Sequence, residues 1–142
     1  MRRAKRFFSL RNHERRLLLR ALWRLSTTCC KLHLLPQKQW RALLAPAHAR
    51  GTTTPRQYSE AEIAWAVHAA ARYVPLANCL PQAIVTKQLM EEQGYQPVLR
   101  IGVRPPEELS LKAHAWVEAG GRIVLGEDGS EYQTLVPGGH AH

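Results

Sequence analysis

Apolar side chains recur at intervals of three and four residues near the start of the chain, which is the spacing of an amphipathic helix. The pattern predicts a helix over residues 12–35 that ends at Pro36, because a proline ring cannot continue the helical hydrogen-bond ladder. Arginines stand four residues apart on another face, and we expect them to face water. The apolar positions are Leu18, Leu22, Leu25, Cys29 and Leu32, and the arginines are Arg16, Arg20 and Arg24.

Two further helices are predicted in the middle of the chain. Ser59 followed three residues later by Glu62 is a capping box, which predicts a helix over residues 60–74. Asn78 is a residue type that often caps a helix N-terminus, and it predicts another helix over residues 79–93. A proline after the first of these helices and a glycine after the second are typical of helix ends.

Beyond residue 94 the apolar pattern changes from helical spacing to alternation, which is typical of strands. A small-residue turn, Ala119-Gly120-Gly121, predicts a β-hairpin between the second and third of them. Helices followed by antiparallel strands define an α+β fold class. The predicted strands cover residues 97–103, 113–118, 122–125 and 132–136.

Length and composition are those of one globular domain. The chain has 142 residues, of which 45% are apolar and 22% are charged. We find no run of 18 apolar residues that would span a membrane, and we expect no secretory signal peptide. Three cysteines are too few for a disulfide-stabilised scaffold, so we expect reduced thiols and a cytoplasmic location.

Charge is distributed unevenly along the chain. Residues 1–50 contain 13 Lys and Arg against one acid, a net charge of +12. Residues 51–142 contain 7 against 10, a net charge of −3. Such a division indicates two surfaces with different roles. We therefore distinguish a basic helical N-terminal segment, residues 1–50, from a core at residues 59–136.

Cys79 and His114 are the first candidates for chemistry. Cys79 is expected at a helix N-terminus, where unpaired N–H groups and the helix dipole stabilise a thiolate. A thiolate is the nucleophile of cysteine-dependent acyl transfer. His114 is expected at the start of a strand between two alanines, and a strand beginning beside the helix would let it act as general base and acid.

An acid and an oxyanion donor complete the candidate site. Glu127 and Asp128 follow the next strand of the hairpin, which returns toward the His114 end, so either could orient the imidazole. The backbone N–H of Cys79 and the side-chain amide of Gln82, one turn into the helix, could stabilise an oxyanion. A cysteine on a helix, a histidine on a strand and an acid after the next strand form the topology of papain-like and transglutaminase-like enzymes.

Two sequence blocks resemble the lasso peptide biosynthesis B2 proteins, which are the transglutaminase-like cysteine peptidases of lasso peptide gene clusters. The blocks occur in the order and spacing of that family, and the resemblance covers about residues 60–136. The first block is Asn78-Cys79-Leu80-Pro81-Gln82-Ala83, and the second is Ala113-His114-Ala115-Trp116-Val117-Glu118 with Gly121 after it.

The resemblance implies that residues 59–136 form the peptidase core. It assigns Cys79 as the nucleophile and His114 as the base. The acid of this family follows the histidine by about a dozen residues. Gly126 is nearest to that position here, so Asp128 is the preferred acid and Glu127 the next.

The implied reaction removes the leader from a ribosomally made lasso precursor peptide and prepares the core for macrocyclisation. Hydrolysis of this kind needs no bound cofactor, and any ATP dependence would enter through a partner cyclase that forms the macrolactam. The resemblance also implies a separate leader-recognition protein, because the residues before 59 are predicted to be helical rather than a small winged domain.

Two alternatives keep the same fold. A non-catalytic scaffold would hold a peptide for a partner, and a transglutaminase-type enzyme would pass the acyl group to an amine instead of water. Replacing Cys79 or His114 by alanine would separate catalysis from the scaffold role.

The basic segment carries no recognisable chemistry. A leucine-rich face opposite an arginine-rich face suits an anionic membrane surface, which would place the protein peripherally on the inner membrane, and it also suits docking to a partner. Nucleic-acid binding is not favoured, because no binding motif is present. The simplest interpretation is that the leucines pack on the core. Cys29, Cys30 and His33 are too few ligands for a closed metal site, so no metal is expected.

Overall fold

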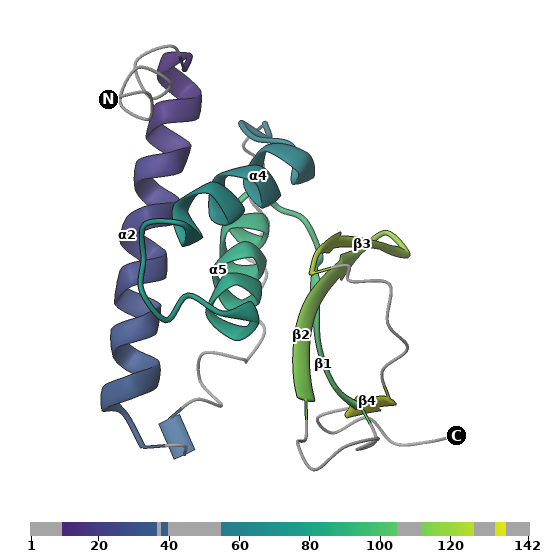
Figure 1. Ribbon diagram of the computed structural model, residues 1–142. Coiled ribbons are helices and arrows are strands. Elements are labelled where there is room, and N and C mark those ends of the chain that lie inside the picture. Colours follow the sequence, from purple (N-terminus) through teal and green to yellow (C-terminus); the bar gives the residue numbers. More distant parts are fainter. Residues whose placement is uncertain (1–9, 37, 40–54, 105–111, 127–132, 136–142) are drawn as a thin grey trace.

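The computed structural model describes residues 10–36, 38–39, 55–104, 112–126 and 133–135 (Figure 1). Within these ranges, three helices precede an antiparallel sheet, which confirms the α+β fold class. The helices are α2 (Asn12–Leu34), α4 (Glu60–Ala71) and α5 (Cys79–Glu92), and the strands are β1 (Val98–Arg104), β2 (Lys112–Ala119), β3 (Arg122–Leu125) and β4 (Gln133–Leu135).

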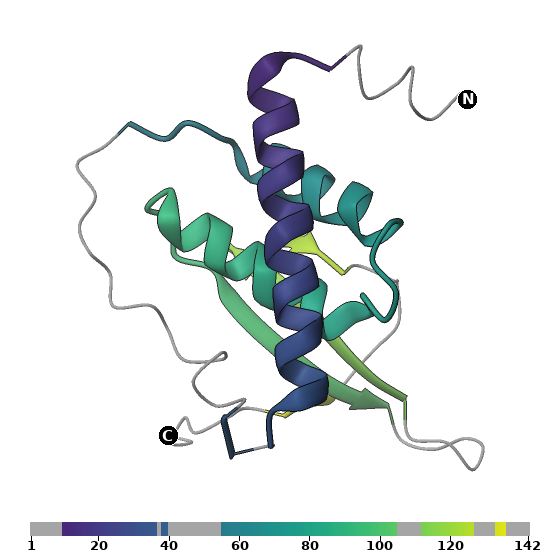
Figure 2. The same cartoon turned by 90° about the vertical axis from the view of Figure 1, so that its left-hand side faces the viewer.

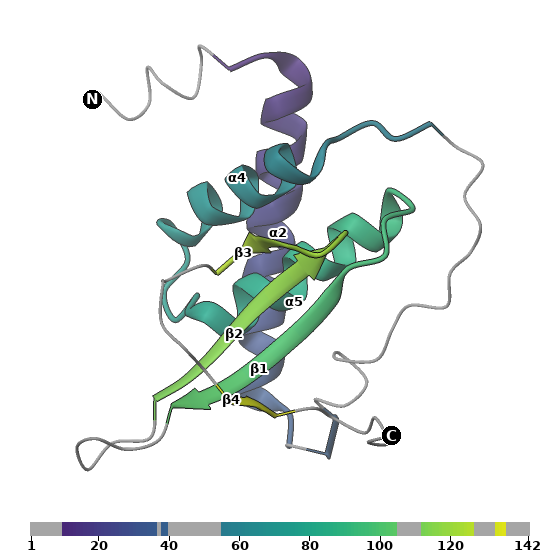
Figure 3. The same ribbon diagram turned by 90° about the vertical axis from the view of Figure 1, so that its right-hand side faces the viewer.

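The four strands lie in the order β3-β2-β1-β4 (Figure 3). In the long central pair, Ile101 stands opposite Ala115 and Gly102 stands opposite His114. The hairpin between β2 and β3 turns at two glycines with φ of +56° and +76°, the backbone that a tight turn of this kind requires. Strands consecutive in sequence, β3 and β4, therefore lie at opposite edges of the sheet.

The helices cover one face of the sheet in two layers. Figure 1 shows α2 on the outside, α4 and α5 in the middle, and the sheet beyond them. α5 is enclosed between α2 and the central strands, and most of its side chains are buried. The largest fully buried apolar side chains are Leu17, Leu25, Ile63, Val67, Ile84, Val85, Met90 and Val117.

α2 belongs to this core. Its predicted start is confirmed, and it ends one residue before the predicted Leu35. Leu17 and Leu25 are buried against α4 and α5, as the simplest interpretation of the basic segment requires. The arginines of α2 were expected to face water only. Two of them, Arg20 and Arg24, instead form ion pairs with Glu92 at the end of α5.

α4 begins at its predicted capping box and ends earlier than predicted. The Ser59 hydroxyl accepts from the Glu62 N–H, and the Glu62 carboxylate accepts from the Ser59 N–H at 2.8 Å. The helix stops at Ala71 instead of residue 74. Pro75 explains the difference, because it has no N–H for the Ala71 carbonyl and its ring would clash with that carbonyl.

Candidate active site

Cys79 is the first residue of α5, at the end of a tight connection from α4. The N–H of Ala77 donates to the carbonyl of Val74 at 3.4 Å, and the N–H of Asn78 donates to the carbonyl of Leu76 at 2.8 Å. Leu76 has a φ of +67°, the left-handed backbone that the third position of a type II turn demands. These two turns place the half-buried Cys79 at the start of the helix, where it packs against the core.

The predicted helix start is confirmed, with Asn78 as the residue that precedes α5. Asn78 occupies the N-cap position, but its side chain makes no capping hydrogen bond. Pro81, two residues after Cys79, has no N–H to cap. In the described part of the chain, the first turn of α5 therefore carries backbone N–H groups without a side-chain acceptor, and these groups favour negative charge beside Cys79.

Gln82 lies beside this turn and anchors it. Its side-chain Nε2 donates to the carbonyl oxygen of Ala77 at 2.7 Å. One amide hydrogen is thus used to hold the backbone immediately before Cys79. The observed contact makes Gln82 a positioning residue for the cysteine, and its predicted oxyanion role stays a prediction.

His114 is the third residue of β2 and is half-buried. Its Nε2 lies 2.5 Å from the carbonyl oxygen of Gly126, just after β3. A carbonyl can only accept, so Nε2 is the donor in this contact. The ring also stacks on Trp116, with centroids 6.1 Å apart and an interplanar angle of 18°.

A polar chain supports that stacked pair on the face of the sheet away from the helices. The Trp116 Nε1 donates to Glu118 at 2.8 Å, and the Nε of Arg100, on β1, donates to the same carboxylate at 3.3 Å. Strand alternation places these side chains together, whereas Ala115 and Val117 point into the core. Alternation within the Ala-His-Ala-Trp-Val-Glu block was the signal that could have identified this support from sequence.

Cys79 and His114 belong to elements that begin at the same end of the molecule. α5 packs on β2, and the two run in the same direction, as Figures 2 and 3 both show. Within the described residues no hydrogen bond joins the Cys79 thiol to the His114 ring. The structure thus brings the helix start and the strand start to one end, without a closed Cys–His hydrogen bond. The predicted acids Glu127 and Asp128 lie outside the described residues.

The other candidate ligands do not assemble. Cys29 is buried, Cys30 is exposed, and the ring of His33 contacts the Cys29 carbonyl at 3.0 Å. Burial, and to a smaller extent the neighbouring Cys30, raises the pKa of the Cys29 thiol, so it stays protonated. Across the ranges that the structure describes, no three His, Cys, Asp or Glu side chains lie close enough to hold a metal.

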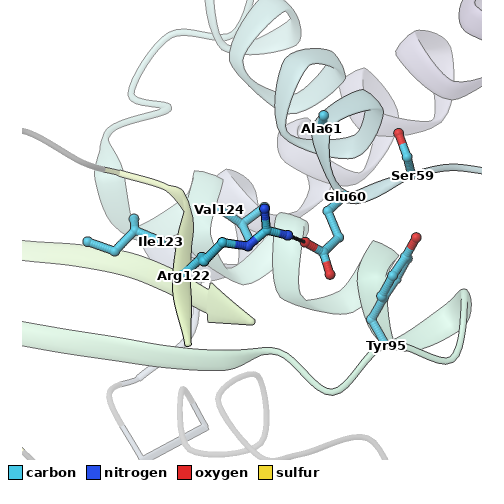
Figure 4. A pocket seen from close by; sticks show the side chains of 7 residues that line it. All are labelled: Ser59, Glu60, Ala61, Tyr95, Arg122, Ile123 and Val124. Carbon is cyan, nitrogen blue, oxygen red and sulfur yellow. Dashed lines mark hydrogen bonds and ion pairs between the residues drawn. The ribbon is translucent and has the colours of Figure 1, made fainter. Parts of the chain in front are cut away.

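A cavity of about 450 Å³ lies at the far end of α5 (Figure 4). An ion pair of 3.3 Å between Arg122 and Glu60 crosses it, and Tyr95 forms another wall. None of the predicted site residues lines this cavity. Because α5 has 14 residues, its two ends are about 20 Å apart, so the cavity is separate from the Cys79 end.

One family model matches most of the chain. The family model described as "Transglutaminase-like superfamily" matches residues 16–137, from the first turns of α2 to beyond β4. No curated protein and no solved structure matches the chain. In the described residues, no helix is long and apolar enough to cross a membrane. With a match over most of its length, the chain belongs to the transglutaminase-like superfamily.

Proposed function

We propose that this protein is a cysteine peptidase that removes the leader from a ribosomally made lasso precursor peptide. The observation that carries the proposal is the placement of Cys79 as the first residue of the enclosed helix in a transglutaminase-like domain. Superfamily membership supports a cysteine-dependent enzyme. The narrower substrate follows from the resemblance of the Cys79 and His114 blocks to the lasso B2 proteins.

The reaction uses the backbone and side chains at this end of the molecule. His114 takes the thiol proton of Cys79 as the general base. The sulfur attacks the carbonyl carbon at the leader–core junction, and the backbone N–H of Cys79 donates to the resulting oxyanion. The C–N bond breaks, His114 passes the proton to the core amine, and the leader remains as a thioester. Water activated by His114 then releases the leader carboxylate and restores the thiol.

In this proposal, the hydrogen bond between Cys79 and His114 forms when the peptide substrate binds. Catalytic hydrogen bonds are often long before substrate binds and shorten in the reactive complex. Because the His114 ring lies on the sheet face away from α5, formation of this hydrogen bond requires the start of β2 to rearrange around the bound peptide.

For the acid we propose Asp128, with Glu127 as the second choice. Val117 pairs with Leu125 in the antiparallel β2–β3 ladder. β3 runs antiparallel to β2, back toward the His114 end of the sheet, and positions 127 and 128 follow it closely in the sequence. An acid there would hold the imidazolium that forms when Cys79 loses its proton.

The proposed reaction requires partners of stated roles. A separate leader-recognition protein would present the precursor, and an ATP-dependent cyclase would join the new core amine to a side-chain carboxylate. The peptidase itself would use no cofactor and would work in the cytoplasm, with the precursor leader as its substrate.

The decisive experiment incubates the full chain with a precursor peptide and the recognition protein and follows the products by mass spectrometry. Wild type should release leader and core, and Cys79→Ala and His114→Ala should release neither. Cys30→Ala is the matched control, because this exposed thiol should leave cleavage unchanged. Asp128→Asn should lower kcat far more than Glu127→Gln. No leader release by wild type, or equal release by Cys79→Ala, would overturn the proposal.

The same assay separates the two alternative functions. A scaffold would retain peptide binding and partner activation in Cys79→Ala. A transglutaminase-type enzyme would join added hydroxylamine to the leader carbonyl at a rate exceeding hydrolysis. Either outcome would replace leader hydrolysis as the function of this site.

A further inference from the structure

α2 carries a second apolar face that no described part of the chain covers. Leu19 is 53% exposed, Trp23 is 72% exposed and Leu34 is 82% exposed. At about 100° per residue these side chains and the exposed Cys30 fall within an arc of about 60°, on the side opposite the core. They extend along about 22 Å of the helix. Figure 2 shows α2 as the outermost helix on this side of the molecule.

One border of this face, which we call the outer face of α2, is basic. Arg16 and Lys31 are exposed beside the apolar side chains, and Arg20 lies next to them while pairing with Glu92. The one acid of α2, Glu14, is engaged at the helix N-terminus, where its carboxylate accepts from the Arg11 N–H. The outer face therefore combines large apolar groups with cations and presents no acid of its own helix.

We propose that the outer face of α2 binds the surface of an anionic lipid bilayer. A tryptophan and leucines projecting from a convex helix, with cations along one border, match the interfacial mode of membrane binding. In that mode apolar side chains enter the headgroup boundary and basic side chains pair with lipid phosphates. The face is a ridge, because its side chains project from a single helix over four turns. A flat bilayer can accept such a ridge along its length, whereas a protein partner would have to supply a complementary apolar groove with an acidic border.

The surface is separate from the proposed peptide chemistry. The opposite side of α2 packs in the core, and Cys79 begins the helix beneath it. Bilayer binding would therefore fix the orientation of the enzyme on the membrane without using any candidate catalytic residue. This inference does not depend on the proposed peptidase activity, and its test needs no peptide substrate.

The test measures co-sedimentation of the full chain with vesicles of phosphatidylcholine alone or mixed with phosphatidylglycerol. We expect association with the anionic vesicles at low salt and at least a tenfold weaker partition when about 0.5 M salt screens the charges. Replacing Leu19 and Trp23 together by serine should weaken the partition about tenfold or more, although it leaves the net charge unchanged. Both side chains are exposed, so folding should be retained, as circular dichroism will show.

Trp65→Ser is the matched control, because Trp65 is 42% exposed on α4, away from the outer face. It should bind vesicles within about twofold of wild type. Three results would overturn the proposal: no association with anionic vesicles, equal weakening by Trp65→Ser, or unchanged binding by the Leu19 and Trp23 double variant. A dimer in sedimentation velocity that the double variant abolishes would also overturn it, since a second copy would then cover the face.

Discussion

The Nε2 of His114 lies 2.5 Å from the carbonyl oxygen of Gly126, across the β2–β3 hairpin. In this contact Nε2 donates to a backbone carbonyl, which holds the ring at the end of β3. Gly126 can approach β2 so closely because it has no side chain. The candidate base is therefore oriented by backbone as well as by its stacking on Trp116.

Substituting Gly126 by alanine should destabilise the fold. Its φ is +95°, and an added Cβ would lie 2.9 Å from the Ala115 carbonyl oxygen and 2.9 Å from the Trp116 Cβ. We expect a loss of about 1–3 kcal/mol in the free energy of unfolding, measured by urea denaturation. Gly120→Ala is the control, because its Cβ would meet nothing within 4 Å and only backbone strain of about 1 kcal/mol remains. Equal losses in the two variants would contradict the close approach.

Leu76→Gly should stabilise the protein. Leu76 holds a φ of +67° and is largely exposed, so glycine removes about 1–2 kcal/mol of strain and sacrifices little burial. The greater freedom of glycine in the unfolded chain offsets about half of this, which leaves a gain of about 0.5–1 kcal/mol in thermal or urea unfolding. Leu76→Ala keeps the left-handed strain and should give no gain. A destabilised glycine variant would show that the turn before Cys79 is not strained.

Gln82→Ala tests whether the side-chain amide anchors the turn before Cys79. Loss of its hydrogen bond to Ala77 should lower the free energy of unfolding by about 1 kcal/mol. Gln88→Ala, in the same helix and equally half-buried, should change it by less than about 0.5 kcal/mol. Unchanged stability with a loss of about 10²–10³ in kcat would instead assign the amide to the oxyanion.

The capping box of α4 should make stability depend on acid. Hydrogen bonds from the Ser59 N–H and hydroxyl, and a further one to His13, hold the pKa of Glu62 below its ordinary value. The native state therefore binds this proton less tightly than the unfolded chain. The contribution of Glu62 to the free energy of unfolding is present above its unfolded pKa of about 4.3. It is lost as pH falls through the pKa of Glu62 in the native state. Glu62→Gln should flatten the unfolding free energy between neutral and acidic pH, and a slope equal to wild type would contradict the assignment.

Local signals were sufficient for the start and type of most elements. The start of α2, the Ser59 capping box and the two-glycine hairpin depend on neighbouring residues, and the sequence predicted all of them. The end of α4 was predicted three residues late, because Pro75 acts on a carbonyl four residues before it.

Contacts between residues far apart in the sequence could not be predicted from local signals. Arg20 and Arg24 pair with Glu92, 72 and 68 residues away, and no helical pattern within α2 indicates that partner. The backbone N–H of Asn78 makes a hydrogen bond within the connection before α5, whereas its side chain makes no capping hydrogen bond. The helix start at Cys79 and the strand position of His114 were predictable, whereas the contact of His114 with Gly126 depends on hairpin register.

Because α2 shares a core with α4 and α5, the folded state does not depend on an unbroken chain between α2 and α4. Leucines of α2 fill the interior, Arg20 and Arg24 reach Glu92, and His13 pairs with Glu62 at 3.2 Å. These contacts do not require the peptide bonds between residues 40 and 54. A chain cut once in that interval should stay a single particle in gel filtration, and separately produced halves should reconstitute it. We therefore expect the contacts of α2 with α4 and α5 to hold the two pieces together without the peptide bonds that join them.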